Sequence, residues 1–415
     1  MDNERKSNII RVGSRKSQLA LIQTNHVIDC LKNVHPDKEF TLVSMTTLGD
    51  RVLDVSLPKI GEKSLFTKDL EDALHNNTVD FVVHSLKDLP TSLPEGLAIG
   101  AVFEREDPRD ALVLRDDIKA TSLEDLPEGS VIGTSSLRRT AQLRGKYPQL
   151  KVIDVRGNLN TRLKKLDDPA TDYSALLLAS AGMQRMGWAD RISKFLPCSD
   201  MMYAVGQGAL AIECRSDSEE ILKMLAPFNH PETYCRILAE RSFLKTLGGG
   251  CSAPVGVSTK LKKLDTNYQL TISGGVWSLD GATKICHTLE QTFEQINILE
   301  QMKNNPKHKL SPTDDGSTKK IKVVDTSDNN DNPLAELDKI IKSDNANCEE
   351  LRNDEEIEAS KKIFCGLKAN RNVPVDVIQK CDDLGRDLAN LLIEKGALDV
   401  MKVTQDLIRS SVVKS

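Results

Sequence analysis

The stretch NIIRVGSRKSQLALIQTNHVIDCL, residues 8–31, changes from a β-prone pattern to an amphipathic one. Asn8–Val12 is a short β-prone run, and the polar residues Gly13–Ser17 follow it. From Gln18 to Leu31 the apolar side chains recur at roughly helical spacing. A strand that enters a helix through a short turn is the building unit of an α/β fold.

The same unit recurs along the chain. Strands are predicted at 40–45 and 79–83, with a helix at 65–74, and the second strand is apolar enough to be buried in a parallel sheet. Strand and helix pairs follow at 130–144 and 151–166, then a buried strand at 175–179 and a glycine turn before 209–213. We therefore expect two α/β lobes that face one cleft, with ligands at the carboxyl ends of strands.

After Pro227 the pattern changes to a smaller α+β unit. Helices are predicted at 232–247 and 377–395, and strands around 255–257 and 268–274. Residues 300–360 contain no aromatic side chain and are rich in Asp, Asn, Lys and Ser. Such a segment buries too little apolar area to offset its ordering entropy, so we expect a disordered insertion there.

The bulk composition excludes several classes of protein. The chain has 415 residues, 39% of them hydrophobic, and a net charge of −5, which argues against a nucleic-acid binder. Its nine cysteines form no C-x-x-C pair, which favours a reducing compartment and predicts no metal site. No apolar run approaches the ~18 residues of a membrane span, and the N-terminus lacks a signal-peptide core. We expect a cytoplasmic protein without a membrane partner.

Asp88 follows a buried strand in the segment Val83–Pro90. It stands between Lys87 and Leu89–Pro90, on a turn that proline stiffens, as a positioned catalytic acid would need. The alternative is a structural residue of an Asx-turn, and the local pattern favours neither reading.

Three strand-to-helix junctions are cationic: Gly13–Gln18, Gly133–Arg139 and Arg156–Arg162. A helix N-terminus offers free N–H groups and the positive end of the helix dipole, and arginines add forked donors suited to carboxylates. The alternatives are a solvated helix face over 131–165 and a simple N-cap at Ser135 or Ser136. Three such junctions together indicate a cleft for a molecule with several negative groups.

Cys251 ends the glycine loop Gly248–Cys251. Three glycines leave room for a large group against the sulfur, and nearby cations would make the thiolate a nucleophile. Taken alone, the pattern fits a buried structural cysteine better.

These motifs, in this order, resemble the porphobilinogen deaminase family. The resemblance covers about residues 8–289 and 362–406, and it rests on the segments VGSRKSQ (12–18), VHSLKDLP (83–90), GTSSLRR (133–139), RGNLNTR (156–162), AVGQGAL (204–210) and GGC (249–251).

The resemblance implies a transferase that links four porphobilinogen molecules head to tail into hydroxymethylbilane, with loss of ammonia, in heme biosynthesis. It implies a dipyrromethane cofactor joined to Cys251 by a thioether, and Asp88 as the catalytic aspartate that stabilises the azafulvene cation left by ammonia. The implied cofactor ligands are Lys87, Ser135, Ser136, Arg138, Arg139, Arg162 and Gln207. The implied substrate ligands are Arg15, Ser17, Arg156 and Arg185.

The resemblance also implies an architecture and partners. Domains 1 and 2 are expected to resemble type II periplasmic binding proteins, and a smaller domain 3 to carry the cysteine. The expected ranges are 1–105 with 206–229 for domain 1, 106–205 for domain 2, and 230–415 for domain 3. A monomer that passes its product to uroporphyrinogen-III synthase is expected.

Two departures from the family pattern concern the loop and the insertion. Gly248 stands where the family usually has glutamate, so we expect a looser loop, and the insertion over 300–360 exceeds the usual length. The segment 52–63 is expected to cover the cleft.

A competing interpretation is a non-enzymatic anion receptor of the periplasmic-binding type. It needs neither Asp88 nor Cys251, but it calls for an export signal. A nucleic-acid binder that uses residues 131–165 lacks interleaved aromatic side chains.

Overall fold

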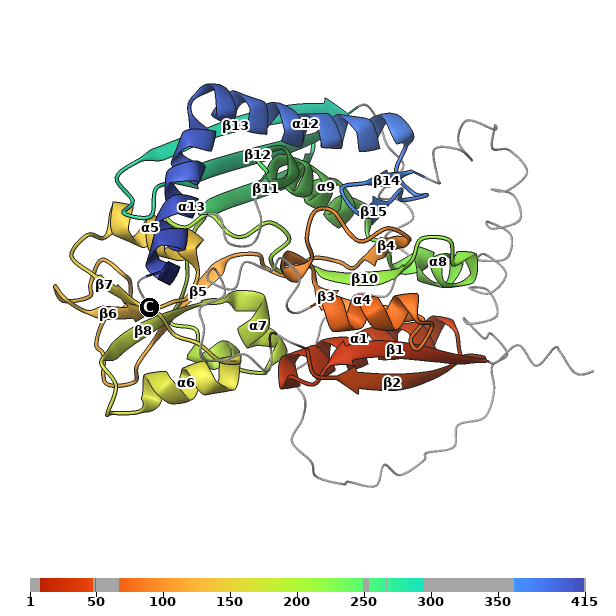
Figure 1. Ribbon diagram of the computed structural model, residues 1–415, viewed down its shortest axis with the longest axis horizontal. Coiled ribbons are helices and arrows are strands. Elements are labelled where there is room, and N and C mark those ends of the chain that lie inside the picture. The colour runs from red at the N-terminus through yellow and green to blue at the C-terminus, as the bar shows by residue number, and fades with distance from the viewer. Residues whose placement is uncertain are drawn as a thin grey trace, which may run out of the picture.

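The computed structural model describes residues 8–47, 49, 67–248, 254–265, 267–293 and 362–413, which form three β-sheets with helices packed on them (Figure 1). The expected cover over 52–63, Cys251 and the expected insertion over 300–360 lie outside the described residues. Within the described ranges no helix is both long and apolar enough to span a membrane.

The first sheet has seven strands in the order β14-β15-β4-β10-β3-β1-β2. Strands β2, β1 and β3 are parallel, whereas β10 runs antiparallel between β3 and β4. Every residue of β4 is buried, as expected for a strand covered on both faces. The elements are β1 (Ile9–Arg15), α1 (Gln18–Val34), β2 (Glu39–Met45), α4 (Lys68–His75), β3 (Phe81–Ser85), the 3-10 helix η1 (Leu86–Asp88), β4 (Leu97–Val102), β10 (Leu210–Arg215), α8 (Glu219–Leu225), η3 (Ala226–Phe228), β14 (Ile363–Phe364) and β15 (Leu367–Lys368).

The second sheet has five strands in the order β7-β6-β8-β5-β9. Strand β6 is parallel to β7 and β8, and β5 is antiparallel to β8 and β9. The elements are β5 (Asp110–Leu114), β6 (Val131–Gly133), α5 (Leu137–Lys146), β7 (Lys151–Ile153), α6 (Leu159–Asp167), β8 (Tyr173–Ala179), α7 (Ser180–Arg185), η2 (Ala189–Arg191) and β9 (Lys194–Phe195).

The third sheet is an antiparallel meander, with helices α9 and α12 on one face. Gly274 in β12 makes that packing possible, because a Cβ there would lie 2.5 Å from the Phe243 ring of α9 and 3.0 Å from Leu388 of α12. The elements are α9 (Pro231–Thr246), β11 (Val255–Lys263), β12 (Tyr268–Trp277), β13 (Lys284–Phe293), α12 (Val375–Glu394) and α13 (Ala397–Val413).

The chain passes twice between the first two sheets. Residues 103–109 lead from β4 to β5, and residues 196–209 lead back from β9 to β10. We call these two segments the outward and return crossovers. Because β3 ends beside the return crossover and β5 begins at the end of the outward one, residues from both lobes meet at this boundary.

The predicted fold class is confirmed: two α/β lobes carry a smaller α+β unit. The predicted helices and strands are present with small shifts of their ends. Helix α13 was not predicted, since Gly396 with a φ of +91° ends α12 and a second helix starts at once. Strands β14 and β15 belong to the first sheet, although the sequence grouped them with domain 3; the proposed domain boundaries themselves stay a prediction.

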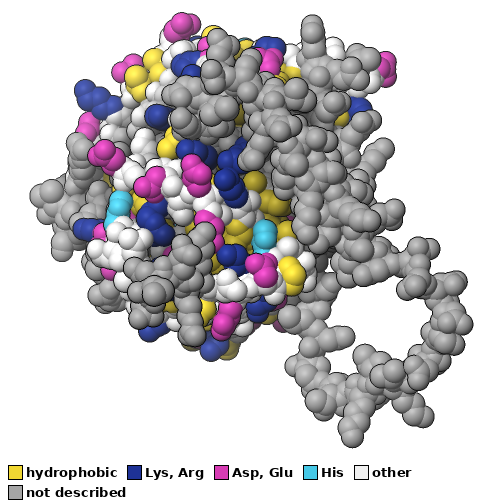
Figure 2. All heavy atoms as spheres, turned by 90° about the vertical axis from the view of Figure 1, so that its right-hand side faces the viewer, with side chains coloured by type: hydrophobic (Ala, Val, Ile, Leu, Met, Phe, Trp, Pro, Cys, Tyr) yellow, Lys and Arg dark blue, Asp and Glu magenta, His cyan; other side chains and the backbone are white. Residues whose placement is uncertain are grey.

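The face shown in Figure 2 carries basic and acidic side chains interspersed among its coloured residues. The described residues on this face form no broad basic stripe of the kind that a nucleic-acid backbone follows.

Candidate active site

Asp88 and Lys87 lie at the carboxyl end of β3, on the single turn η1. The backbone N–H of Leu86 donates to the carbonyl of Ala209 at 3.0 Å, and that of Leu89 donates to the carbonyl of Leu86 at 3.1 Å. Leu86 and Leu89 are buried, whereas Lys87 and Asp88 are half-buried. The turn is therefore anchored on both sides by leucines, which leave the two charged residues at the edge of the lobe.

The glycines of the return crossover let it pack tightly against this turn. Gly206 has a φ of +76°, and a Cβ there would lie 3.1 Å from the backbone N of Lys87. Gly208 has a φ of +87°, and its Cβ would lie 2.6 Å from the carbonyl of Glu106 on the outward crossover. Both positions therefore favour glycine for conformation and for space.

The junction before α5 separates the roles of its two serines. Ser136 is the N-cap, with its hydroxyl accepting from the backbone N–H of Arg139 at 3.5 Å. The Ser135 hydroxyl donates to the carbonyl of Val155 instead. The N-cap that the sequence left open between them is Ser136.

Arg138 and Arg139 are both buried at the start of α5, and both donate to Asp110, the first residue of β5. Arg138 also donates to the carbonyl of Met202, and Arg139 to that of Leu177 at 2.9 Å. The Nε–H of each arginine is buried without a hydrogen-bond partner among the described residues. A buried donor without an acceptor costs free energy, which an anionic ligand would offset.

At the junction before α6, the Arg162 Nε donates to the carbonyl of Gly157 at 2.8 Å. Burial, together with the charges of Arg139 and Arg156, lowers the pKa of Arg162 to about 10, although Asp154 opposes the shift. Arg156 is half-buried. The cations of the second and third junctions are therefore close enough to repel one another.

The first junction, Gly13–Gln18, contacts the third junction, Arg156–Arg162, across the boundary between the two lobes. Ser17 caps α1, accepting from the backbone N–H of Ala20 at 3.4 Å, and Arg15 ends β1. The next residue, Gln18, accepts a 2.6 Å hydrogen bond from the amide of Asn160 near the start of α6. The structure thus brings the N-termini of α1 and α6 together, one from each lobe.

The charges of Arg138 and Arg139 also act on Lys87. Burial lowers the pKa of Lys87 to about 8; Asp88 and Asp110 raise it, whereas Arg138 and Arg139 lower it. A lysine under these influences gains from any further negative charge placed beside it. We call Lys87, Arg138, Arg139 and Arg162, with Asp88 and Asp110, the cation cluster.

Arg185 and Gln207 are committed to contacts within the protein. Arg185 is buried, donating to Glu106 at 3.1 Å and to the carbonyl of Gly208 at 2.8 Å. The Gln207 amide donates to the carbonyl of Pro108 at 2.7 Å and to Asp110 at 2.8 Å. Their role as ligands stays a prediction.

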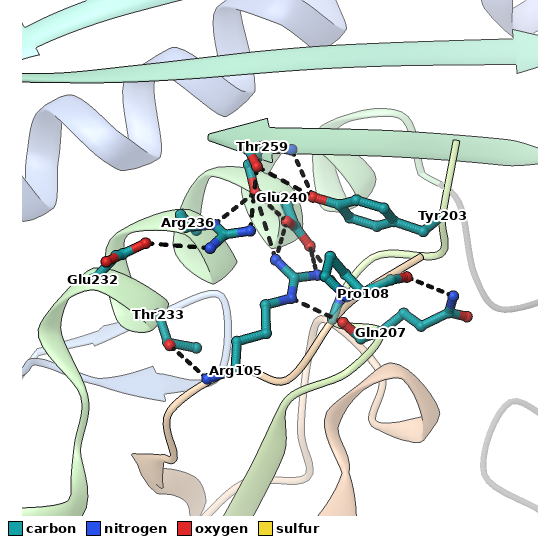
Figure 3. Close-up of polar contacts among 10 residues, drawn as sticks. Arg105, Pro108, Tyr203, Gln207, Glu232, Thr233, Arg236, Glu240 and Thr259 are labelled. Carbon is teal, nitrogen blue, oxygen red and sulfur yellow. Dashed lines mark hydrogen bonds and ion pairs between the residues drawn. The ribbon is translucent and has the colours of Figure 1, made fainter. Parts of the chain in front are cut away.

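A buried network links the crossovers to the third unit (Figure 3). Arg105 of the outward crossover pairs with Glu240 of α9 through hydrogen bonds of 2.5 and 3.0 Å. Its Nε donates to the carbonyl of Gln207 at 2.8 Å, so one guanidinium joins α9 to the return crossover. No local pattern in the sequence predicts this pair, because its members lie 135 residues apart.

Helix α9 leads toward Cys251, but the described chain stops at Gly248 and resumes at Pro254. Gly248 has a φ of +67°, and its N–H donates to the carbonyl of Lys245 at 3.0 Å. A glycine in this conformation directly after a helix is a favourable C-terminal cap. Gly248 thus forms a favourable end to α9, and the expectation of a looser loop stays a prediction.

Sequence reasoning missed Asp110, which is fully buried and accepts from three side chains. A usable signal was present, since Asp110 stands directly before the apolar run 111–114. A carboxylate that opens a buried strand needs charged or hydrogen-bonding partners.

Two family models match the chain. "Porphobilinogen deaminase, dipyromethane cofactor binding domain" matches residues 10–223, and "Porphobilinogen deaminase, C-terminal domain" matches residues 234–302. Among curated relatives, the porphobilinogen deaminase of Synechococcus elongatus is 58% identical over 272 residues, 66% of this chain and 83% of the relative. The protein of the same name from Nostoc is 54% identical over 280 residues, 68% of this chain and 85% of the relative.

The solved structures found to be similar include the methionine binding protein MetQ and the periplasmic aliphatic sulphonate binding protein SsuA of Escherichia coli. MetQ is 15% identical, with a TM-score of 0.34 over 55% of this chain and 93% of MetQ. SsuA is 14% identical, with a TM-score of 0.32 over 59% of this chain and 76% of SsuA. Likenesses of this size carry no argument about function.

Proposed function

The chain belongs to the porphobilinogen deaminase family, and from that premise we propose that Asp88 is its catalytic carboxylate, at the edge of a cation cluster that binds pyrrole carboxylates. As a member of this family the chain is a transferase that joins four porphobilinogen molecules head to tail into hydroxymethylbilane and releases ammonia. It uses a dipyrromethane cofactor, which supplies the pyrrole carbon from which the product grows.

The cation cluster fits a ligand with several carboxylates. Porphobilinogen carries an acetate and a propionate on its ring, and every ring of the growing chain keeps both. The observation that carries the proposal is the pair of unpartnered Nε–H donors on Arg138 and Arg139, beside two cations whose pKa is lowered. The proposed cofactor ligands are Lys87, Ser135, Ser136, Arg138, Arg139, Arg162 and Gln207, with Cys251 as the attachment point.

The N-termini of α1 and α6 suit the incoming substrate. The contact of Gln18 with Asn160 joins the junction that contains Arg15 and Ser17 to the junction that contains Arg156, which supports a shared substrate site. Helix N-termini and arginines both stabilise carboxylates. We propose that the carboxylates of the substrate are bound by Arg15, Ser17, Arg156 and Arg185.

Asp88 has a role that follows from charge. Loss of ammonia from porphobilinogen leaves a positive charge on the substrate, which a carboxylate beside it stabilises. The same carboxylate accepts a proton from the pyrrole as the new bond forms. Leu86 and Leu89 hold the turn in place, so the carboxylate needs little reorganisation during the reaction.

The proposal extends to the protein's setting. We propose a monomer in the cytoplasm that passes hydroxymethylbilane to uroporphyrinogen-III synthase. The seven described cysteines are free thiols, which suits a reducing compartment. Light scattering tests the monomer, for which a mass near 45.9 kDa is expected.

The decisive experiment combines mass spectrometry with turnover. The intact protein should exceed its polypeptide mass by one dipyrromethane, and Cys251→Ala should lose the adduct. Purified protein should consume porphobilinogen and release a bilane that cyclises to uroporphyrinogen I.

The Asp88 assignment needs its own control. Asp88→Asn should keep the fold and lose nearly all turnover. Asp116→Asn, at an aspartate whose side chain is 87% exposed, should keep both the fold and the turnover. Near-normal turnover in Asp88→Asn would refute the catalytic role. Binding of porphobilinogen without turnover or adduct in the wild type would favour an anion receptor instead.

A further inference from the structure

Asp110 is the buried acceptor at the centre of the cation cluster. Its carboxylate accepts from Arg138 at 2.7 and 3.3 Å, from Arg139 at 2.7 Å and from Gln207 at 2.8 Å. None of its surface is exposed. The donors come from α5 and from the return crossover, so one carboxylate organises groups from two separate segments.

One carboxylate facing two guanidinium groups leaves the pair with excess positive charge. Burial by itself would raise the pKa of Asp110, but the charges and hydrogen bonds of Arg138 and Arg139 outweigh it and hold the pKa well below its usual range. Asp110 is therefore ionised at neutral pH, and it neutralises one of the two arginines.

The hydrogen bonds of Arg138 and Arg139 also determine which of their N–H groups lack a partner. The Nη atoms donate to Asp110, Met202 and Leu177, whereas both Nε–H groups have no partner in the described structure. Asp110 thus holds each guanidinium by its Nη groups and leaves the Nε edge for another acceptor.

We propose that Asp110 is a positioning residue for the reaction: it holds Arg138 and Arg139 by their Nη groups and so leaves their Nε–H donors for the carboxylates of the pyrrole chain. The inference rests on the proposed function, because it presumes that these cations bind pyrrole carboxylates. It adds a residue that does not itself touch the substrate.

The effect on Lys87 gives a readout that a purely structural role would not move. Four charged groups influence the pKa of Lys87: Asp88 and Asp110 raise it, and Arg139 and Arg138 lower it. Removing the charge of Asp110 should therefore lower the pKa of Lys87 further. Lys87 should then lose its proton at a lower pH, and the alkaline limb of the pH–rate profile should move toward neutrality.

The test uses Asp110→Asn in the full-length holoenzyme. Asparagine has nearly the same shape and still accepts a hydrogen bond, but it carries no charge. Lys87 is acylated with acetic anhydride over a range of pH and quantified by peptide mass spectrometry, alongside kcat and KM for porphobilinogen. The same labelling of Cys251→Ala backgrounds reports on Lys87 without the cofactor.

We expect a fall in kcat of tenfold or more, and half-acylation of Lys87 at a pH at least half a unit lower than in the wild type. Asp107→Asn is the matched control, since Asp107 lies on the outward crossover three residues before Asp110, is partly exposed and pairs with Arg109. It should change neither quantity. Wild-type kcat together with wild-type labelling of Lys87 in Asp110→Asn would overturn the proposal, whatever happens to thermal stability.

If Asp110→Asn does not yield folded protein, Asp110→Glu tests the positioning role instead. The longer side chain keeps the charge and displaces the arginines, so the proposal requires wild-type labelling of Lys87 with a reduced kcat. A wild-type kcat in this variant would overturn the positioning role. Failure of the proposed function is distinguishable, because it would appear as absent turnover in the wild type.

Discussion

Replacing Glu240 by alanine should open the junction between the crossovers and the third unit. Glu240 is fully buried and accepts from Arg105 twice, from the N–H of Gly206 at 2.9 Å and from the Thr259 hydroxyl at 2.6 Å. Alanine removes all of these acceptors at once and leaves the Arg105 charge buried and unpaired.

The free-energy cost of the substitution follows from the loss of these hydrogen bonds. Removing one member of a buried ion pair costs about 3–5 kcal/mol, because the remaining charge keeps its desolvation penalty. Arg105 would keep only the Gln207 carbonyl, a contact with Thr259 and the face of the Tyr203 ring, 4.9 Å away. Glu240→Gln keeps the shape and one acceptor, so it should cost less, about 1–3 kcal/mol.

Hydrogen exchange is the suitable assay, since a chain of three units does not unfold in one step. Peptides that contain Gly206 and Thr259 report on the junction directly. Glu240→Ala should lower their opening free energy by about 3–5 kcal/mol. The double change Arg105→Met with Glu240→Met should restore most of it, because no charge is left buried.

The pH dependence provides an internal check. Burial would raise the pKa of Glu240, but Arg105 outweighs burial and holds the pKa below its usual range. The stabilisation is therefore complete above the unfolded pKa, about 4.3, and is lost as the pH falls through the folded pKa. Glu240→Gln should lack this acid-dependent loss.

The control is Glu232→Ala on the same helix. Glu232 has a side chain 35% exposed and forms a surface pair with Arg236, so its loss should cost less than about 1 kcal/mol. A loss below about 1 kcal/mol in Glu240→Ala would refute the reasoning, since it would mean that the buried pair is not needed to hold the junction.

Three further predictions concern glycines. Gly206→Ala should destabilise the protein by about 1–3 kcal/mol and lower kcat, because its φ is +76° and its Cβ would press on Lys87; an unchanged melting temperature and kcat would contradict this. Gly248→Glu should lower the melting temperature, at a cost of about 1–2 kcal/mol for a left-handed residue, whereas a rise would show that the glycine does loosen the loop. Gly281→Ala should increase hydrogen exchange in residues 278–283, because Gly281 packs directly against Gly145 of α5; exchange equal to the wild type would argue against this contact.

Much of the fold could be predicted because the local signals were strong. The β-prone run Asn8–Val12 and the helical spacing from Gln18 located β1 and α1, although β1 continues to Arg15, and the apolar run at Val79–Val83 located β3 to within two residues. The place of β10 could not be predicted in this way. Its sequence shows a buried strand, but nothing local states that it runs antiparallel between β3 and β4.

The same difference between local and long-range signals applies to the candidate site. Asp88, Lys87 and the arginine junctions were visible because charge stands next to strand ends in the sequence. Asp110 also stands next to a strand end, but its pairing with Arg138 and Arg139 could not be predicted, because they follow 28 and 29 residues later. Neither was the contact of Gln18 with Asn160, 142 residues away, which only the packing of the two lobes creates.

The path of β10 has a consequence for synthesis on the ribosome. The second lobe, from β5 to β9, is one uninterrupted stretch of chain, so it can fold as soon as it emerges. The first lobe begins earlier but cannot finish its sheet until β10 follows the whole of the second lobe, and β15 arrives later still. Pairings of such long sequence separation form slowly. Until β10 is synthesised, β3 and β4 lack the strand that lies between them. During this interval the nascent chain most needs protection from aggregation.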